Sequence, residues 1–358
     1  MEFIEELSEK EYEEFVSNAP KTHFMQSYAF GQVRKMKGFI PHYVGLRDGK
    51  KLVCAALLLE KKLIFSYSYY YVPRGYVIDY DNFQLLDEFT SCLKSFAKKN
   101  HAIFIKIDPD IKRWNLNGEG ERVGDFNNNS LIEHLKNIGY RHRGFNKGFE
   151  AEQPRFTFRL NLERTIDEIF KNFHPTTRKI LNKGNKYQLE IYKGGMDDIE
   201  DFYETMKETA KREGILQAPL SYYKTFYEEF NRDGHSDLYV AKVNVEKLKQ
   251  IMKENLESLE KDLESLNDEK YKNQEKNKNK KQELSNQLSK LKKDYEEVLK
   301  IDLKEIVLSS IITVKYKDMV WTVHGGNHSI LMNLNANYLL YYTIIEDAHK
   351  DGYKVVPI

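Results

Sequence analysis

The stretch HYVGLRDGKKLVCAALLLEKK, residues 42–62, contains two apolar runs separated by Asp48 and Gly49. Asp-Gly is a strong signal for a tight turn between antiparallel strands, because both residues tolerate a left-handed backbone. The stretch therefore predicts a pair of neighbouring strands. The aromatic run YSYYYVPRG, residues 67–75, predicts a further strand that ends at the Pro73-Arg74-Gly75 break.

The order of elements around this hairpin occurs twice in the chain. After the first hairpin, residues 81–100 have apolar side chains at helical spacing, and AIFIKIDPD, residues 102–110, predicts a buried strand. In the second half, LYVAKVN (238–244) and EIVLSSIITVKY (305–316) predict strands, followed by MVWTVHGGN, a helix and YKVVPI. The order indicates an internal duplication at a spacing of about 200 residues.

The joint between the two strands of the second hairpin holds a long charged segment where the first copy has only Asp48-Gly49. Leu248, Met252, Leu256, Leu259, Leu263 and Leu266 follow heptad spacing, and so do Leu284, Leu288, Leu291, Tyr295 and Val298. The periodicity disappears between these runs. We therefore predict an antiparallel helical hairpin with arms about 30 Å long.

The tip of this hairpin is basic. Its lysines are Lys270, Lys272, Lys276, Lys278, Lys280 and Lys281, opposed only by Glu275. Charge runs are usually solvated faces, so a dimerisation or spacer hairpin is one interpretation. The other is contact with a phosphate backbone, for which several lysines provide attraction that is blind to sequence. Pattern alone favours the first interpretation.

Composition restricts the class of protein. The 358 residues are 41% hydrophobic and 31% charged with a formal net charge of +1, which is enough chain for two domains and argues against a general nucleic-acid coat. The acidic N-terminus does not resemble a signal peptide, and no apolar run approaches the length of a transmembrane segment. Cys54 and Cys92 form neither a disulfide framework nor a zinc pattern. We expect a cytoplasmic protein.

Common catalytic motifs are absent from the sequence. It contains no Walker loop, GxGxxG, HExxH, CxxC pair or GxSxG elbow, and its histidines do not cluster at ligand spacing, so we expect no cofactor and no metal. Basic residues instead gather at predicted helix ends, as in Arg34-Lys35 and Lys211-Arg212. Such residues offset the helix macrodipole. Several of them beside an aromatic groove would also suit a pyrophosphate ligand.

Six segments together carry a family resemblance: FMQSYAFGQVRK (24–35), YYVPRGYVID (70–79), IFIKIDPD (103–110), FHPTTRKILNKGNKYQLEI (173–191), ETAKREGILQAPLSYYKTFYEEF (208–230) and VHGGN with the helix after it. In this order they resemble the Fem family of aminoacyl-tRNA-dependent transferases, which build the interpeptide bridge of peptidoglycan. The resemblance implies an α+β fold of two GNAT-like (acetyltransferase-type) half-domains. It implies half-domains at 1–147 and at 148–245 with 301–358, and a helical arm at 246–300, as in the FemA and MurM type.

The resemblance also implies a reaction and its participants. An amine on the stem peptide of lipid II or UDP-MurNAc-pentapeptide would attack the ester of an aminoacyl-tRNA, the co-substrate. A lipid-linked acceptor would bring the protein into peripheral contact with the membrane. The resemblance also reverses the preference for the arm, because it makes tRNA contact the expected use of the basic tip.

Specific residues receive roles from the same resemblance. Arg34 with Lys35 and Arg212 would contact the muropeptide diphosphate, and Tyr71 and Arg74 would line the cleft. Asp108 would accept or orient a proton. Each has a simpler interpretation, since Asp108 can cap the turn at Pro109 and Tyr71 can be a core residue.

Two features depart from the family pattern. YKVVPI ends at Ile358 in mid-strand, so we expect a sheet with an open edge and weak or no transfer unless the missing strand is supplied. Trp321 and His324 stand where the family more often has tyrosines. Alternatives at this point are a truncated, non-catalytic relative that binds muropeptide or tRNA, and an ordinary GNAT acyltransferase that uses a thioester.

Overall fold

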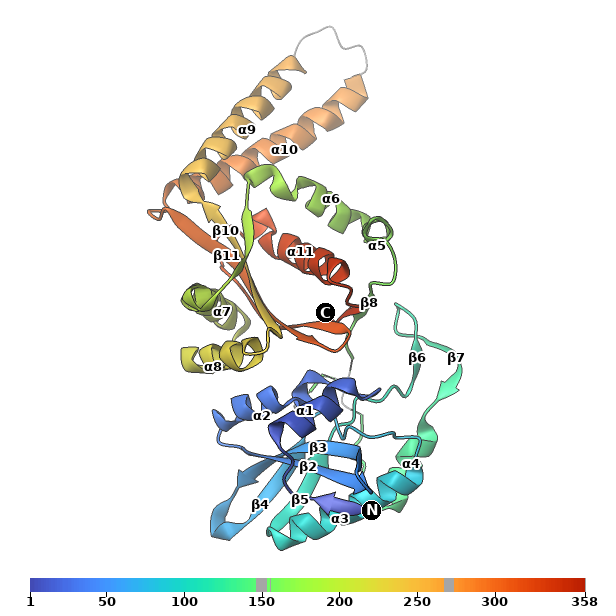
Figure 1. Ribbon diagram of the computed structural model, residues 1–358. Helices are drawn as coiled ribbons and strands as arrows, with labels where there is room; N and C mark the ends of the chain where they lie inside the picture. The colour runs from blue at the N-terminus through green and yellow to red at the C-terminus, as the bar shows by residue number, and fades with distance from the viewer. Residues whose placement is uncertain (146–152, 155, 267–273, 358) are drawn as a thin grey trace. The chain divides into compact units, whose positions relative to one another are not determined.

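The computed structural model describes residues 1–145, 153–154, 156–266 and 274–357, and it divides into two compact units (Figure 1). Unit 1 contains Met1–Phe158, Glu228–His235 and Lys315–Lys317. Unit 2 contains Arg159–Tyr227, Ser236–Val314 and Asp318–Ile358. Each unit is a mixed α+β structure built on its own sheet.

Unit 1 is built on a five-stranded sheet of order β1-β2-β3-β4-β5. Its strands are β1 (Glu2–Ile4), β2 (Ile40–Asp48), β3 (Lys51–Lys62), β4 (Ser68–Val72) and β5 (Ala102–Ile107). Its helices are α1 (Glu9–Asn18), α2 (Tyr28–Lys35), α3 (Phe83–Lys99) and α4 (Asn129–Asn137), and a small hairpin comprises β6 (Trp114–Leu116) and β7 (Arg122–Asn127). The β2–β3 pair around Asp48 confirms the predicted turn.

Both faces of β3 are buried, which explains its continuous apolar run. Cys54, Ala56 and Leu58 belong to a core with the apolar side of α3, including Leu86 and Phe89. The alternate residues Ala55, Leu57 and Leu59 point to the opposite face and are also fully buried. A strand covered on both faces loses the polar–apolar alternation that would otherwise mark it.

Unit 2 repeats this arrangement in a six-stranded sheet of order β8-β13-β12-β11-β10-β9. Its strands are β8 (Arg159–Asn161), β9 (Glu190–Gly194), β10 (Ser236–Asn244), β11 (Glu305–Tyr316), β12 (Met319–Asn327) and β13 (Val355–Pro357). Its helices are α5 (Ile166–Asn172), α6 (Pro175–Gly184), α7 (Ile199–Glu213), α8 (Leu220–Asn231, whose last residues from Glu228 belong to unit 1), α9 (Val245–Ser265), α10 (Gln274–Leu299) and α11 (Ala336–Lys350).

The two sheets confirm the duplication. The order β1-β2-β3-β4-β5 corresponds to β9-β10-β11-β12-β13, and in each sheet the last pair in that order is parallel. A helix connects that parallel pair in both units, α3 in the first and α11 in the second. Because proline disfavours helix in the residue before it, the sequence predicts a break between two helices at His174-Pro175, and α5 indeed ends at Asn172 while α6 begins at Pro175.

Three expectations about strands require correction. The edge beyond β13 is not open, because β8 pairs with it antiparallel, Val355 opposite Asn161. The segment 102–107 forms β5 but is not a buried strand, since Ile103 and Phe104 are about half exposed. The Asn, Gly and Asp content of residues 112–130 predicts a loop, whereas this segment contains the β6–β7 hairpin. The short strands β1, β8 and β9 were missed, because three to five residues carry little periodicity.

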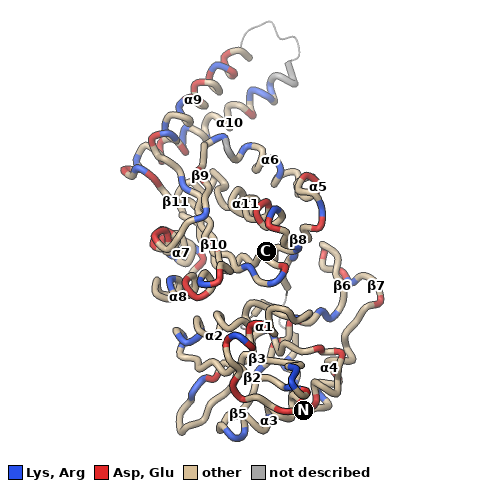
Figure 2. Tube along the Cα trace, in the orientation of Figure 1, with Lys and Arg blue, Asp and Glu red and all other residues tan. Residues whose placement is uncertain are grey.

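The helical hairpin leaves the second sheet between paired strand ends. Asn244 lies opposite Glu305, so β10 and β11 pair up to the bases of α9 and α10, which lie side by side (Figure 1). The buried seam contains Leu248, Met252, Leu256, Leu291 and Val298, as the heptad spacing predicted. Acidic and basic residues are mixed along both arms (Figure 2). Among the described residues, no helix has the length and apolarity needed to cross a bilayer.

Candidate functional site

The parallel pairing of β4 and β5 brings together two of the predicted site residues. Tyr71 lies opposite Lys106 in the register, and Asp108 follows immediately after the end of β5. Because the carboxyl ends of parallel neighbours meet at one edge of a sheet, residues 37 positions apart in sequence become neighbours. The Tyr71 hydroxyl donates to Oδ2 of Asp108 at 2.8 Å.

A tight turn after β4 supplies the second donor to this carboxylate. The backbone N–H of Arg74 donates to Oδ1 of Asp108 at 2.6 Å. Arg74 and Gly75 both have left-handed backbones, with φ of 58° and 74°. A side chain at Gly75 would also collide, since an added Cβ would lie 2.8 Å from Cα of Pro109. Glycine is therefore required in PRG, and the turn aims the Arg74 N–H at Asp108.

Lys21 fixes this turn through hydrogen bonds to its backbone. Its ammonium donates to the carbonyls of Arg74 and Tyr76, the latter at 3.0 Å. Lys21 is half-buried as a whole, and its ammonium is the enclosed part. Burial therefore lowers the pKa of Lys21 to about 8, although the charges of Asp110 and Asp108 act to raise it. Gln26 adds a third anchor by donating to the Pro73 carbonyl at 2.7 Å. The turn is thus fixed by side chains from the segment before α2.

Asp108 is poised between opposing influences. Burial raises the pKa of its carboxyl above the usual value, while the hydrogen bonds from Tyr71 and the Arg74 N–H and the charges of Arg74 and Lys106 pull in the other direction. The Lys106 ammonium lies 5.4 Å from the centre of the Tyr71 ring. Each carboxylate oxygen accepts one hydrogen bond from these donors and has a further lone pair. The arrangement can therefore accept a proton from an incoming amine.

The simpler interpretations of Tyr71 and Asp108 hold alongside this chemistry. Tyr71 is a core residue, only 2% exposed, and its hydroxyl is nevertheless committed to Asp108. Asp108 does fix a turn, but it is the Pro73-Arg74-Gly75 turn rather than the one at Pro109. The guanidinium of Arg74 donates to the carbonyl of Pro154 at 3.3 Å.

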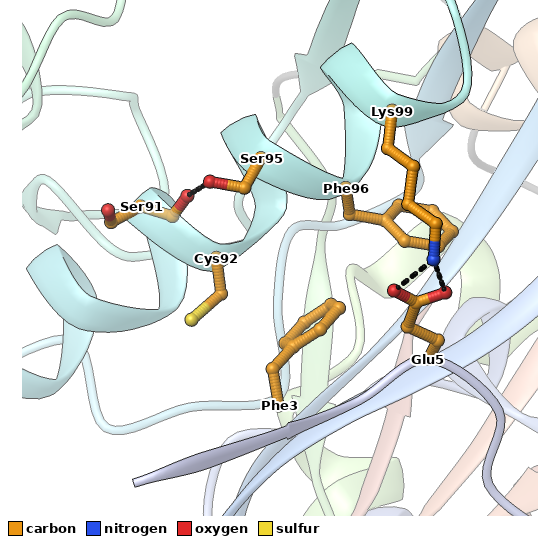
Figure 3. Close-up of a pocket in the computed structure, with 7 residues that line it drawn as sticks. All are labelled: Phe3, Glu5, Ser91, Cys92, Ser95, Phe96 and Lys99. Carbon is orange, nitrogen blue, oxygen red and sulfur yellow. Dashed lines mark hydrogen bonds and ion pairs between the residues drawn. The ribbon is translucent and has the colours of Figure 1, made fainter.

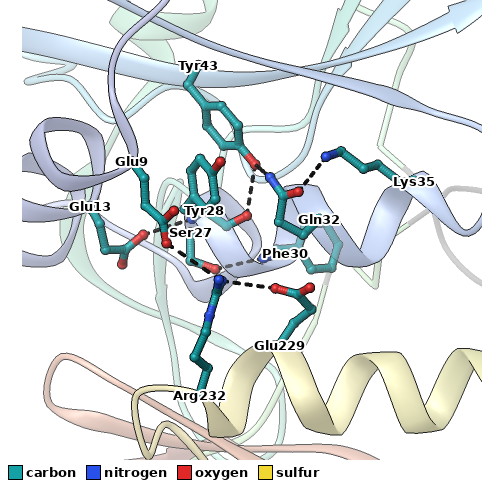
Figure 4. Close-up of polar contacts among 10 residues, drawn as sticks. All are labelled: Glu9, Glu13, Ser27, Tyr28, Phe30, Gln32, Lys35, Tyr43, Glu229 and Arg232. Carbon is teal, nitrogen blue, oxygen red and sulfur yellow. Dashed lines mark hydrogen bonds and ion pairs between the residues drawn. The ribbon is translucent and has the colours of Figure 1, made fainter.

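Arg34 and Lys35 lie at the end of α2, as the sequence predicted. The Arg34 guanidinium stacks on the Phe39 ring at 4.6 Å, and Lys35 donates to the Gln32 side chain. Gln32 in turn donates to the Tyr43 hydroxyl, which donates to the Tyr28 carbonyl (Figure 4). Lys35 therefore terminates a structural hydrogen-bond chain, whereas Arg34 is held by an aromatic face.

Arg212 belongs to unit 2, whereas Arg34, Lys35, Tyr71 and Arg74 belong to unit 1. It lies in the last turn of α7, where it pairs with Glu213 and donates to the Asn327 carbonyl at 3.3 Å. Close approach of α7 to the end of β12 requires Gly326, because an added Cβ would lie 2.5 Å from the Thr205 backbone. The VHGGN segment ends β12, as predicted.

The basic tip of the hairpin is only partly within the described residues. Lys270 and Lys272 lie outside them, and Lys276 is placed in α10 without a described side chain. Lys278, Lys280 and Lys281 are exposed in the first turns of α10.

A separate cavity of about 250 Å³ lies between β1 and α3, lined by Phe3, Glu5, Ser91, Cys92, Ser95, Phe96 and Lys99 (Figure 3). The Lys99–Glu5 ion pair, at 2.8 Å, borders it. Burial raises the pKa of the Cys92 thiol, which disfavours a nucleophilic thiolate. Within the described ranges, no group of three or more His, Cys, Asp or Glu side chains is arranged to hold a metal ion.

Sequence reasoning missed Lys21 and Lys106. Lys106 had a signal, since it is the one charged residue inside the apolar strand AIFIKI and precedes Asp108 by two positions, on the same side of the strand. Lys21 had none, because its role depends on where the Pro73-Arg74-Gly75 turn lies in space.

Comparisons with known proteins bear on the family and the overall fold of the chain. The FemAB family profile matches residues 7–356. Lipid II:glycine glycyltransferase of Staphylococcus aureus (strain USA300) is 26% identical over 362 residues, covering 97% of this chain and 82% of the relative. The crystal structure of FemX superposes with a TM-score of 0.75 at 22% identity, covering 100% of this chain and 88% of FemX. A tandem GNAT protein from the clavulanic acid biosynthesis pathway gives a TM-score of 0.47 at 8% identity.

Fold and comparisons together define the class: an enzyme of the aminoacyltransferase type, built from two half-domains with corresponding sheets, with the fold of FemX. Within that class, the chain belongs to the FemAB family.

Proposed function

We propose that this enzyme transfers an amino acid from aminoacyl-tRNA to the stem-peptide amine of lipid II during formation of the peptidoglycan interpeptide bridge. The observation that carries the proposal is the Asp108 carboxylate, which is held by Tyr71 and the Arg74 N–H and has a raised pKa. The family supports the reaction type, and the name of the staphylococcal relative supports a lipid-linked acceptor over the nucleotide-linked one.

The chemistry needs a proton acceptor but no covalent enzyme intermediate, because the aminoacyl ester is already activated. The amine nitrogen forms the new C–N bond, and the ester C–O bond breaks. Asp108 accepts the proton that the amine loses and returns it to the ribose oxygen that leaves. A buried carboxylate with a raised pKa is a stronger base than a solvated one, which suits this role.

Cationic residues would hold the acceptor. In unit 1, Arg34 is a proposed contact of its diphosphate, since a guanidinium presents paired donors that match phosphate oxygens. Arg34 is held on Phe39 with its planar group oriented in advance. Lys35 would add charge, while Arg74 and Tyr71 border Asp108 and would line the cleft around the reacting amine.

The helical arm is proposed to contact the tRNA. Lys278, Lys280 and Lys281 are exposed on α10 beside the tip sequence that contains Lys270, Lys272 and Lys276. Contacts with phosphates would make this binding strongly dependent on salt concentration.

Transfer of labelled amino acid from aminoacyl-tRNA to lipid II tests the reaction. We expect Asp108→Asn, which keeps the shape but cannot accept a proton, to lower kcat by about 100-fold or more. Asp79→Asn is the matched control, because Asp79 is exposed and accepts only a local hydrogen bond from the Asp81 N–H. Equal rates for the wild type and Asp108→Asn would refute the assignment. Binding of lipid II and tRNA without any transfer would instead favour a non-catalytic relative.

The arm is tested separately by filter binding of charged tRNA. Replacing residues 246–300 by a short Asn-Gly linker should weaken tRNA binding at least tenfold and leave lipid II binding unchanged. Unchanged tRNA affinity would refute the proposed role of the arm while leaving the role of Asp108 intact.

A further inference from the structure

An apolar patch with a basic rim lies at the β5 edge of the first sheet. It consists of Leu63, Ile64, Phe65 and Tyr67 from the β3–β4 connection, and Ile103 and Phe104 from β5. Ile64 is 75% and Phe65 85% exposed, which is unusual for side chains of this size. We call these six residues the β5-edge patch.

The patch is continuous across two segments of the chain. Tyr67, Ile103 and Phe104 line one groove of about 400 Å³ together with Lys94, Lys98 and other residues at the end of α3. The Ser68 N–H donates to the His101 carbonyl, which ties the end of the connection to the start of β5. The Phe104 ring stacks on Tyr69 at 5.0 Å. Ile64 and Phe65 project from the connection that Tyr67 ends.

The backbone keeps these side chains outside the core. Phe65 and Ser66 both have positive φ, 55° and 61°, which is unfavourable for residues other than glycine. The Leu63 N–H and the Tyr67 carbonyl close the connection at 2.8 Å. A strained connection that exposes its largest apolar residue indicates that exposure itself has a use.

Charge identifies the partner. Residues 61–78 and 89–107 contain no Asp or Glu, and the exposed Lys94 and Lys98 line the groove beside the apolar residues. Lys62 precedes the connection and pairs with Glu60, and the Lys94 ammonium also donates to the Ile138 carbonyl. Apolar side chains ringed by lysines match the surface of an anionic bilayer, where lysines meet lipid phosphates and apolar groups enter the acyl boundary. A second copy fits less well, because a two-fold contact through this patch would place lysines against lysines.

We propose that the β5-edge patch binds the surface of an anionic lipid bilayer, with Ile64 and Phe65 inserted and Lys94 and Lys98 facing the headgroups. This goes beyond the proposed transfer reaction. Its test uses no substrate, so failure of either proposal can be recognised without the other.

Vesicle co-sedimentation of the full chain tests the proposal. We expect binding to vesicles of equal parts phosphatidylglycerol and phosphatidylcholine, much weaker binding to phosphatidylcholine alone, and weakening by salt. Ile64→Ser with Phe65→Ser should lower the partition coefficient at least tenfold. Lys94→Gln with Lys98→Gln should lower it by about five-fold for each lysine, on anionic vesicles only.

The matched control is Ile215→Ser with Leu216→Ser, an exposed apolar pair in unit 2, which should leave binding unchanged. Because every altered residue is exposed, circular dichroism should show that the variants fold. Phe65→Trp gives a direct readout, since its emission should shift to the blue on anionic vesicles.

Three results would overturn the proposal. The first is equal binding to anionic and neutral vesicles. The second is wild-type binding by the Ile64→Ser, Phe65→Ser variant. The third is a wild-type dimer, seen by light scattering, that this variant converts to a monomer without a change in vesicle binding. The last result would assign the patch to a second copy of the chain.

Discussion

The Tyr71 hydroxyl is the most accessible test of how the site is tuned. Tyr71→Phe removes one oxygen and leaves the ring in the core, where the residue is 2% exposed. What disappears is the 2.8 Å hydrogen bond to Oδ2 of Asp108. That bond lowers the pKa of Asp108 and partly opposes the effect of burial, so its loss should raise this pKa further.

The size of the effect follows from the strength of such bonds. A hydrogen bond to a charged group contributes about 1.5–3 kcal/mol, and 1.36 kcal/mol corresponds to a tenfold change in a proton affinity. If Asp108 must be deprotonated to accept a proton, activity falls as pH falls through its pKa. The acid limb of the kcat profile should therefore move up by about one to two pH units in Tyr71→Phe.

The assay is single-turnover transfer measured from about pH 5 to pH 9, with urea unfolding of each variant in parallel. Well above the acid limb, Tyr71→Phe should approach the wild-type rate, whereas on the limb it should be about 10–100-fold slower. This split distinguishes a change of proton affinity from simple damage to the fold, which would lower the rate at every pH.

The matched control is Tyr69→Phe, two residues earlier on β4, whose ring stacks on Phe104. It should leave the acid limb in place. The reasoning is refuted if Tyr71→Phe leaves the limb unmoved while Asp108→Asn abolishes transfer, because Tyr71 would then not set the proton affinity of Asp108.

Three further predictions concern stability. Burial lowers the pKa of Lys21 to about 8, so between pH 8 and the usual lysine range the unfolded chain binds more protons than the folded chain. The unfolding free energy of the wild type should therefore rise by about 2 kcal/mol between about pH 7 and 9.5. In urea titrations Lys21→Met should lack this rise, and the same pH dependence of stability in both proteins would contradict the reasoning. Gly75→Ala should lower the unfolding free energy by about 2–4 kcal/mol. Gly49→Ala, at a position with positive φ but open space around it, should lower it by only about 1 kcal/mol. Equal losses would show that the close contact with Pro109 is unimportant. Leu256→Ala should lower the unfolding free energy by about 2–3 kcal/mol and speed amide hydrogen exchange in α9 but not in β10. The control Leu299→Ala, at an exposed position, should change little. Faster exchange in β10 would show that the arm and the sheet unfold together.

Much of the fold was readable because its signals are local. The Asp48-Gly49 turn, the proline at α6 and the heptad leucines each act within a few residues, and the structure has them where predicted. β5 was misjudged as buried, because an apolar run does not show whether a partner covers it. β8 was missed because a three-residue strand exists only through its pairing with β13.

The candidate site divides in the same way. Tyr71, Arg74 and Asp108 came from a family resemblance, and the structure brings all three together. Lys21 contributes through two backbone carbonyls on a turn more than fifty residues away, which no local pattern can indicate. The places of Arg34 and Arg212 at helix ends were predictable, but their partners Phe39 and Asn327 were not.

The pairing of Asn244 with Glu305 also has a consequence for how the chain folds. Sixty residues, 245–304, separate these partners, compared with two between Asp48 and Lys51 in the first unit. Closing the longer loop from a random coil would cost about 3 kcal/mol more in chain entropy. A preformed helical hairpin removes most of that difference, because its two bases already lie together. We therefore expect the arm to form early and to nucleate the β10–β11 pair, so that a segment lying outside the sheet sets the rate at which the second unit folds.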